Sequence, residues 1–229
     1  MPSQPVLELQ YASQALAIPV RYLLNVGYAG RNRAAVEHHL DELAGIGIPR
    51  PTRVPTVYPV SSNLALTCPS IQVQHDNTSG EVEYVVIVAG ERRFVTVGSD
   101  HTDRTIEQTS VPWAKQACPN IVAPEVWLYE EVKPHWDDLL IRSWVAQGGD
   151  WLLYQETSLS ELIRAEELLA LAKEVVADCA TGLVLFSGTV PTRRGLICGE
   201  GYRIEIEDPH LGRSISHEYA VEVLPPAIQ

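Results

Sequence analysis

Cysteine is scarce in this sequence, with four residues among 229, and no two of them form a Cys-x-x-Cys pair. Paired cysteines hold most structural zinc ions, and closely spaced cysteines support small disulfide-rich domains. The sequence therefore argues against both kinds of site. We expect reduced thiols at Cys68, Cys118, Cys179 and Cys198.

Basic residues are also few: 17 Lys and Arg stand against 29 Asp and Glu, which gives a formal net charge of -12. Such a surface repels nucleic acids and anionic membranes unless basic residues gather locally. The arginine pairs Arg92-Arg93 and Arg193-Arg194 are short and isolated, which is typical of solvated surface. We therefore expect no nucleic-acid and no membrane partner. An acidic protein needs a local cation to hold an acidic substrate, and a metal ion would supply one.

Long apolar runs are absent as well. No stretch approaches the roughly 20 apolar residues that a membrane-spanning helix needs. The first residues carry neither the basic nor the apolar segment of a secretory signal. We expect a cytoplasmic protein.

Apolar residues make up 45% of the chain, enough for a sizeable core, and no repeat divides it. Period-two patterns outnumber helical ones, which predicts an α+β fold rich in strands. We expect strands at 6–11, 81–88, 94–97, 136–146, 151–155, 183–186, 202–206 and 220–223, and helices at 31–43 and 160–180, the latter capped by Ser158 or Ser160.

The most unusual local pattern is Glu81-Val82-Glu83 at the start of a valine-rich strand. Alternation puts both carboxylates on one strand face, where they repel each other and need a cation or water. A strand end whose glutamates simply reach water fits this spacing equally well. Asp100 follows the next strand and could join them across the hairpin. Three carboxylates in one pocket suit Mg²⁺, Mn²⁺ or Ca²⁺.

At these residues the sequence resembles the fumarylacetoacetate hydrolase superfamily, as a divergent subgroup. A Glu-x-Glu strand, a loop similar to Ser99–Arg104, a lysine like Lys115 and a loop like Ser187–Pro191 follow one another in the family's order. The resemblance covers about residues 20 to 224. It implies a β-rich mixed roll, with residues 1–60 forming an N-terminal strand and lid-helix region, residues 61–229 forming the catalytic domain, and two copies forming a homodimer.

The resemblance also assigns roles to single residues. It implies Glu81, Glu83 and Asp100 as ligands of Mg²⁺ (or Mn²⁺ or Ca²⁺), and Lys115 as a catalytic cation. The residues that it implies for substrate binding are Thr189, Gly188, His101, Arg104 and Gln155.

The N-terminal helix supplies a candidate base. Gly30-Arg31-Asn32 resembles the family's segment before its lid, and His39 and Glu42 are three residues apart, so they share one helix face. A glutamate can charge an imidazole that activates water, although a surface His beside a Glu is also common. His38 is the neighbouring alternative.

Departures from the family's pattern indicate an atypical substrate pocket. Ser99 replaces an asparagine and Val190 replaces a proline. His101 is either a base in the pocket or a hydrogen-bond donor that orients Asp100, and we favour the second. Gln155 resembles a family glutamine but fits equally a residue that closes a strand hydrogen bond.

The function implied is a divalent-metal-dependent hydrolase that cleaves a carbon–carbon bond in a 2-oxo or diketo acid. A decarboxylase, hydratase or tautomerase on the same site is the alternative. A non-catalytic binding protein of small molecules is a third possibility, and clustered like charges argue against it, because a scaffold alone does not need them.

Overall fold

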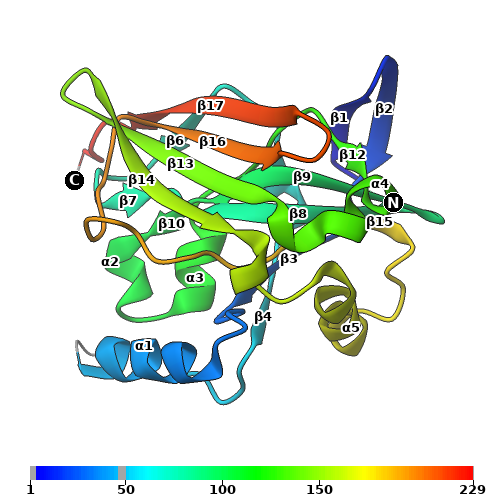
Figure 1. Ribbon diagram of the computed structural model, residues 1–229. Helices are drawn as coiled ribbons and strands as arrows, with labels where there is room; N and C mark the ends of the chain where they lie inside the picture. Colours follow the sequence, from blue (N-terminus) through cyan, green and yellow to red (C-terminus); the bar gives the residue numbers. More distant parts are fainter. Residues whose placement is uncertain (1–3, 46–49, 229) are drawn as a thin grey trace.

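The computed structural model describes residues 4–45 and 50–228, and strands dominate it. Figure 1 shows a five-stranded sheet lying over an eight-stranded one. The larger sheet has the order β4 (Thr56–Val60), β3 (Tyr22–Gly27), β15 (Thr181–Phe186), β8 (Val82–Ala89), β9 (Arg92–Asp100), β11 (Asn120–Val122), β5 (Ala65–Leu66), with β12 (Trp127–Leu128) also paired to β9. The smaller sheet has the order β14 (Asp150–Ser158), β13 (Leu140–Gln147), β16 (Gly201–Asp208), β17 (Arg213–Val223), β6 (Ser70–Val73).

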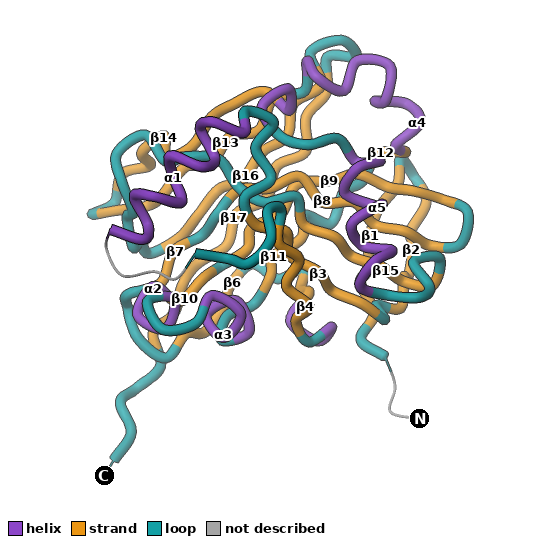
Figure 2. Tube along the Cα trace, turned by 90° about the horizontal axis from the view of Figure 1, so that it is seen from below, coloured by secondary structure: helices purple, strands orange, loops and turns teal. Residues whose placement is uncertain are grey.

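Two short antiparallel strand pairs, five α-helices and three 3₁₀ turns complete the described elements. The pairs are β1 (Val6–Tyr11) with β2 (Gln14–Pro19), and β7 (Thr78–Ser79) with β10 (Thr102–Asp103). The helices are α1 (Arg33–Gly45), α2 (Arg104–Glu107), α3 (Val111–Gln116), α4 (Tyr129–Val132) and α5 (Ala165–Val175), and 3₁₀ turns lie at Ser62–Leu64, Lys133–Asp138 and Leu159–Glu161. Seen from below in Figure 2, α1 and α5 lie in front of the strands. None of the helices within the described residues is long and apolar enough to cross a bilayer.

The predicted hairpin at the centre of the larger sheet is confirmed. β8 and β9 pair antiparallel from Val82 opposite Ser99 to Ala89 opposite Arg92, and Gly90 (φ 65°) makes the turn. Only a residue without a side chain adopts that left-handed conformation readily. This register sets the positions of the acidic residues at the open end of the hairpin.

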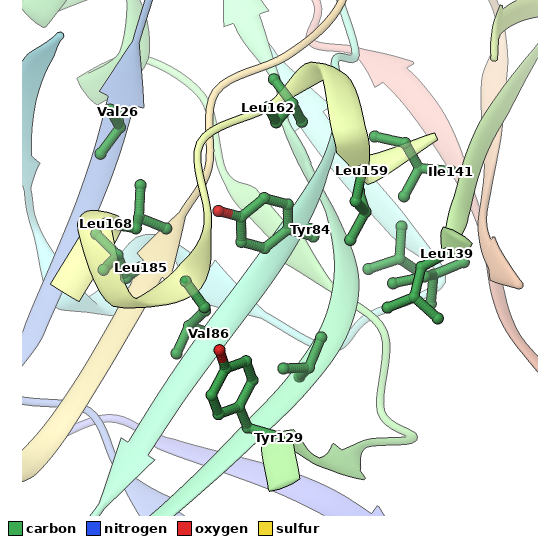
Figure 3. Close-up of a cluster of buried hydrophobic side chains, with 14 of the residues drawn as sticks. Val26, Tyr84, Val86, Tyr129, Leu139, Ile141, Leu159, Leu162, Leu168 and Leu185 are labelled. Atoms are coloured by element: carbon green, nitrogen blue, oxygen red, sulfur yellow. The ribbon is translucent and has the colours of Figure 1, made fainter. Parts of the chain in front are cut away.

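Both faces of β8 are buried, so its sequence is almost continuously apolar. Tyr84 and Val86 point to one side, into the cluster drawn in Figure 3 around Leu168 of α5. Val85 and Ile87 point to the other side, into a second core cluster. A strand covered on both faces holds its ends rigidly, because any shift would disturb two packed cores.

The N-terminal region is continuous with the rest of the fold. β3 and β4 are strands of the larger sheet, and Leu24 and Leu23 of β3 lie in the same two core clusters as β8. The division into residues 1–60 and 61–229 stays a prediction.

The helix α5 and the strand β13 begin later than the sequence predicts. α5 starts at Ala165, with Arg164 rather than Ser158 or Ser160 at its cap, and the Arg164 amide donates a hydrogen bond to Glu167 Oε1. Tertiary hydrogen bonds explain the delay: the Arg31 amide donates to Glu161 O, and the Ile163 amide donates to Ala29 O. The predicted strand from residue 136 starts at Leu140, because Lys133–Asp138 forms a 3₁₀ turn.

Candidate metal centre

Three carboxylates converge at the open end of the β8–β9 hairpin, as the sequence predicts. Because Val82 pairs with Ser99, Glu81 lies opposite Asp100, and the Asp100 amide donates to Glu81 O at 3.1 Å. Glu83 is two residues further along the same face. One carboxylate oxygen from each of the three lies within 4.8 Å of the others.

Two cations face this acidic cluster. Lys115, on α3, forms an ion pair with Asp100 Oδ2, and its Nζ lies 3.7 Å from Glu81 Oε2. Arg104, at the start of α2, places Nη2 2.8 Å from Glu81 Oε1 and Nη1 2.8 Å from Glu107 Oε2. Four carboxylates thus share two cations, and the site keeps an excess of negative charge.

Burial and mutual repulsion act on the cluster. Only 1% of Glu83 and none of Asp100 is exposed. Burial, together with the negative charge of Asp100, holds the pKa of Glu83 well above its usual range. Burial also raises the pKa of Asp100, to about 6, although Lys115 opposes that shift. Burial would raise the pKa of Glu81 too, but the charges of Arg104 and Lys115 outweigh it and lower that pKa.

Glu83 leaves a ligand atom without a protein partner. Its Oε2 accepts a hydrogen bond of 2.7 Å from the Gly188 amide. Its Oε1 is buried and has no hydrogen-bond partner among the described residues. A buried, unsatisfied carboxylate oxygen costs on the order of 1–3 kcal/mol, which binding of a cation would remove.

The spacing of the oxygens fits one divalent ion. Ligand oxygens lie about 2.0–2.6 Å from Mg²⁺ or Ca²⁺, so two ligands on opposite sides of one ion are roughly 4–5 Å apart. The observed limit of 4.8 Å falls in this range. An all-oxygen set suits hard cations such as Mg²⁺, Mn²⁺ and Ca²⁺.

Two buried asparagines, which sequence reasoning missed, hold Asp100. Asn25 of β3 donates to Asp100 Oδ1 at 2.9 Å, and Asn120 of β11 donates to the same oxygen at 3.3 Å. Asn120 also donates to Asn25 Oδ1 at 2.9 Å. Each is a polar residue in an apolar strand, a signal that could have marked them.

The loop after β15 supports the cluster from the other side. Gly188 has a φ of 86°, and a Cβ there would lie 2.7 Å from Val26 O, so only glycine fits. This backbone aims the Gly188 amide at Glu83. The hydroxyl of the next residue, Thr189, donates to Val82 O at 2.9 Å. Gly188 and Thr189 are therefore anchored directly to the strand that carries the candidate ligands.

Gln155 fixes that loop, and its own hydrogen-bonding capacity is filled by the protein. Its Nε2 donates to Thr189 Oγ1 at 2.8 Å and to Val190 O at 2.7 Å. Its Oε1 accepts from the Val82 amide at 3.0 Å and from Ser143 Oγ at 2.9 Å. An amide oxygen accepts two hydrogen bonds and an amide nitrogen donates two, so none remains for a substrate. The geometry gives Gln155 a positioning role.

His101 does not orient Asp100, which corrects the interpretation favoured above. Its ring nitrogens contact Tyr219 Oη at 3.1 Å and Thr78 Oγ1 at 2.9 Å. Consecutive residues of an extended chain point to opposite faces, so His101 points away from the carboxylates. Burial lowers the pKa of His101 to about 3, which keeps the ring neutral.

Two tyrosines lie on the Lys115 side of the site and were also missed. Tyr58 of β4 pairs with Asn25 across the sheet, and its ring centroid lies 6.0 Å from Lys115 Nζ. Tyr28 follows β3 with a φ of 60°, a conformation that costs a residue with a side chain about 1–2 kcal/mol. Burial raises the pKa of both tyrosines.

The predicted His39–Glu42 dyad lies in α1, but both side chains are outside the described part of the structure. The segment before the helix is firmly attached. Gly30 pairs with Leu162, and Arg31 Nη2 contacts Asp137 Oδ1 at 2.6 Å. In Figure 1 the helix itself lies at the lower edge of the molecule, outside both sheets.

Comparison with sequence families places the chain. A family described as "Protein of unknown function (DUF2848)" matches residues 26–219. The chain belongs to this family. The matched range contains every candidate ligand named above. No curated protein matches the sequence.

Solved structures share the fold over nearly the whole chain. Fumarylpyruvate hydrolase from Pseudomonas aeruginosa, in complex with Mn²⁺ and pyruvate, superposes with a TM-score of 0.67 at 17% identity, covering 98% of each chain. A 5-carboxymethyl-2-hydroxymuconate delta-isomerase from Mycobacterium smegmatis gives 0.63 at 16%, covering 91% of this chain and 81% of the other. A 2-keto-3-deoxy-D-arabinonate dehydratase complexed with magnesium and 2,5-dioxopentanoate gives 0.61 at 17%, covering 93% and 77%.

These likenesses confirm the expected fold. The chain has the same β-rich fold as these solved structures. At such low identities the similarity establishes the fold alone, and the chemistry has to be argued from the residues of this chain.

Proposed function

We propose that this protein is a divalent-metal-dependent enzyme that hydrolyses a carbon–carbon bond in a 2-oxo or diketo acid. The observation that carries the proposal is the unpartnered Oε1 of Glu83, buried between Glu81 and Asp100. A buried carboxylate with a raised pKa and an unfilled oxygen is a cost to the fold, and a cation is the group that relieves it.

Glu81, Glu83 and Asp100 would hold Mg²⁺, or Mn²⁺ or Ca²⁺. The bound ion would supply Lewis-acid chemistry, polarising a 2-oxo carbonyl. The amides of Asn25 and Asn120 keep Asp100 in position for this task. The protein part of the site is therefore preorganised before substrate arrives.

Lys115 provides the fixed positive charge of the site. Burial alone would lower the pKa of this ammonium, but Asp100, Glu81 and Glu83 raise it, so it stays protonated. A protonated amine beside the reacting centre stabilises an oxyanion that develops during bond cleavage. We assign this role to Lys115.

The loop at Gly188 and Thr189 would hold the far end of the substrate, and Gln155 would hold that loop. Arg104 would act on the site indirectly, because it donates a hydrogen bond to Glu81 and orients that carboxylate. Tyr28 and Tyr58 border the Lys115 side, where a polar substituent of the substrate would lie. His101 faces away from this space and contacts Tyr219 and Thr78 instead.

Hydrolysis needs a base for water, and His39 with Glu42 is our candidate, with His38 as the alternative. A decarboxylase or a hydratase on the same site would depend less on this pair. The related folds support a shared substrate class, because their structures hold pyruvate or 2,5-dioxopentanoate beside Mn²⁺ or magnesium. A homodimer and a cytoplasmic location remain predictions.

We expect Mn²⁺ to stabilise the protein strongly. A ligand at 100 times its dissociation constant adds about 2.7 kcal/mol to the free energy of unfolding. Each kcal/mol raises the thermal midpoint by roughly 2–4 °C for a chain of this length, so we expect a rise of about 5–10 °C. Differential scanning calorimetry measures it, and a chelator must reverse it. No change in the midpoint with millimolar Mn²⁺ would count against the site.

The function itself is tested on a panel of 2-oxo and diketo acids, including fumarylpyruvate, with chelated and Mn²⁺-loaded protein. A hydrolase consumes water and releases a 2-oxo acid and a second carboxylic acid, whereas a decarboxylase releases carbon dioxide. Metal-dependent formation of the two acids supports the proposal. Carbon dioxide, or a hydrated or isomerised product, would replace hydrolysis by one of the alternatives.

A further inference from the structure

A chain of buried hydrogen bonds joins the smaller sheet to the metal centre. Tyr219, on β17, contacts Ser99 Oγ at 2.7 Å and His101 Nδ1 at 3.1 Å. His101 Nε2 contacts Thr78 Oγ1 at 2.9 Å, and at the other end the Glu81 amide donates to Ser99 Oγ at 3.2 Å. None of Ser99 or His101 and only 2% of Tyr219 and Thr78 is exposed.

These hydrogen bonds connect two separate sheets. β17 belongs to the five-stranded sheet, while β8 and β9 belong to the eight-stranded sheet beneath it in Figure 1. The Tyr219 ring is fixed from two sides, stacked on Tyr202 at 5.6 Å and edge-on to His101 at 5.8 Å between ring centroids. A rigid aromatic ring therefore sets where the Tyr219 hydroxyl lies.

Gly80, the residue before Glu81, leaves space for this hydroxyl because it has no side chain. A Cβ at Gly80 would lie 2.4 Å from Tyr219 Oη and 2.8 Å from Ser99 Oγ, closer than atoms can pack. The hydroxyl thus occupies the space directly beside the backbone that leads into Glu81. Any shift of Tyr219 acts on that backbone.

The residues of this hydrogen-bond network have the donors and acceptors that their contacts with one another require. A neutral imidazole has one donor and one acceptor nitrogen, so His101 links Tyr219 to Thr78 as a donor to one and an acceptor from the other.

We propose that Tyr219, which belongs to the smaller sheet, is a positioning residue for Glu81 and acts on it through Ser99. This inference rests on the proposed function, in which Glu81 is a metal ligand. Partners outside the ligand sphere orient the ligands, and their loss weakens metal affinity by about 10- to 100-fold. We expect the same here, because Glu81 lies just before β8 and its amide donates to the Ser99 side chain.

The test is Mn²⁺ binding to Tyr219→Phe, measured by isothermal titration calorimetry on full-length protein. We expect a dissociation constant about 10- to 100-fold above that of the wild type. Tyr84→Phe is the matched control. Its hydroxyl is equally buried and donates to Ile163 O at 2.6 Å, so its hydrogen bond leads to the segment before α5 and not to Ser99 and Glu81. The control should lose stability without losing Mn²⁺ affinity.

Two further variants keep the proposal falsifiable if Tyr219→Phe does not fold. Ser99→Ala removes the atom that receives the Glu81 amide, and Gly80→Ala displaces the Tyr219 hydroxyl without removing any group. Each should weaken Mn²⁺ binding. Wild-type affinity in a folded Tyr219→Phe or Ser99→Ala protein would overturn the positioning role and leave the metal site standing. Absence of Mn²⁺ binding by the wild type would overturn both.

Discussion

Replacing Glu83 with alanine is expected to abolish both Mn²⁺ binding and turnover. Glu83 is the candidate ligand whose buried Oε1 has no hydrogen-bond partner among the described residues. Loss of a direct ligand should exceed the roughly 10- to 100-fold weakening caused by loss of an outer partner. Titration calorimetry and a steady-state assay measure the two effects. Circular dichroism establishes that the variant is folded.

Glu205→Ala is a suitable control for this experiment. Glu205 lies on β16 of the smaller sheet, and its carboxylate pairs with Arg142 at 3.0 Å. Its removal takes away the same side-chain atoms, but from the other sheet, on which no candidate ligand lies. Glu205→Ala should therefore bind Mn²⁺ normally. Undiminished binding by Glu83→Ala would show that the cluster is not the metal site.

His39→Ala is expected to lower the turnover number by about 10²- to 10⁴-fold while leaving the Mn²⁺ dissociation constant nearly unchanged. A base acts on the proton of water, not on the metal ion, so the two quantities should separate. The rate constant and the dissociation constant are measured on the same protein preparation.

His38→Ala is the matched comparison, because it removes the neighbouring imidazole from the same helix. A loss confined to His38→Ala would transfer the role of base to that residue. Normal rates in both variants would contradict the hydrolytic mechanism and favour a decarboxylase that needs no such base.

The sequence was sufficient for the part of the site that depends on local pattern. Glu81 and Glu83 share a face because strand residues alternate, and Gly90 marks the turn that brings Asp100 back beside them. These relations involve residues no more than 20 positions apart. A hairpin converts such short spacings into contacts without needing knowledge of the rest of the fold.

Residues from distant strands were out of reach of the same reasoning. Asn25 can donate to Asp100 because β3 lies beside β15 in the larger sheet. Tyr58 lies in the same region because β4 pairs with β3. Nothing in a single sequence states that strand order. The face of His101 was also misjudged, since the family's loop pattern shows which residues are present but not which way each one points.

Tertiary contacts also overrode local propensity in one helix. Helical spacing predicts a start near Ser160, but Leu159–Glu161 forms a 3₁₀ turn and the following residues are extended. The backbone there is held by the segment that precedes α1, through hydrogen bonds to Ala29 and Arg31. Hydrogen bonds to a distant segment can outweigh the small energy of one helical turn.

A crystal structure with Mn²⁺ and oxalate, which mimics the enolate of a 2-oxo acid, would show whether Glu81, Glu83 and Asp100 hold one divalent cation for such an acid. We expect an anomalous peak about 2.0–2.6 Å from one oxygen of each carboxylate, with oxalate bound to the same ion. Mn²⁺ elsewhere, or carboxylates that remain paired only with Lys115 and Arg104 at saturating Mn²⁺, would contradict it.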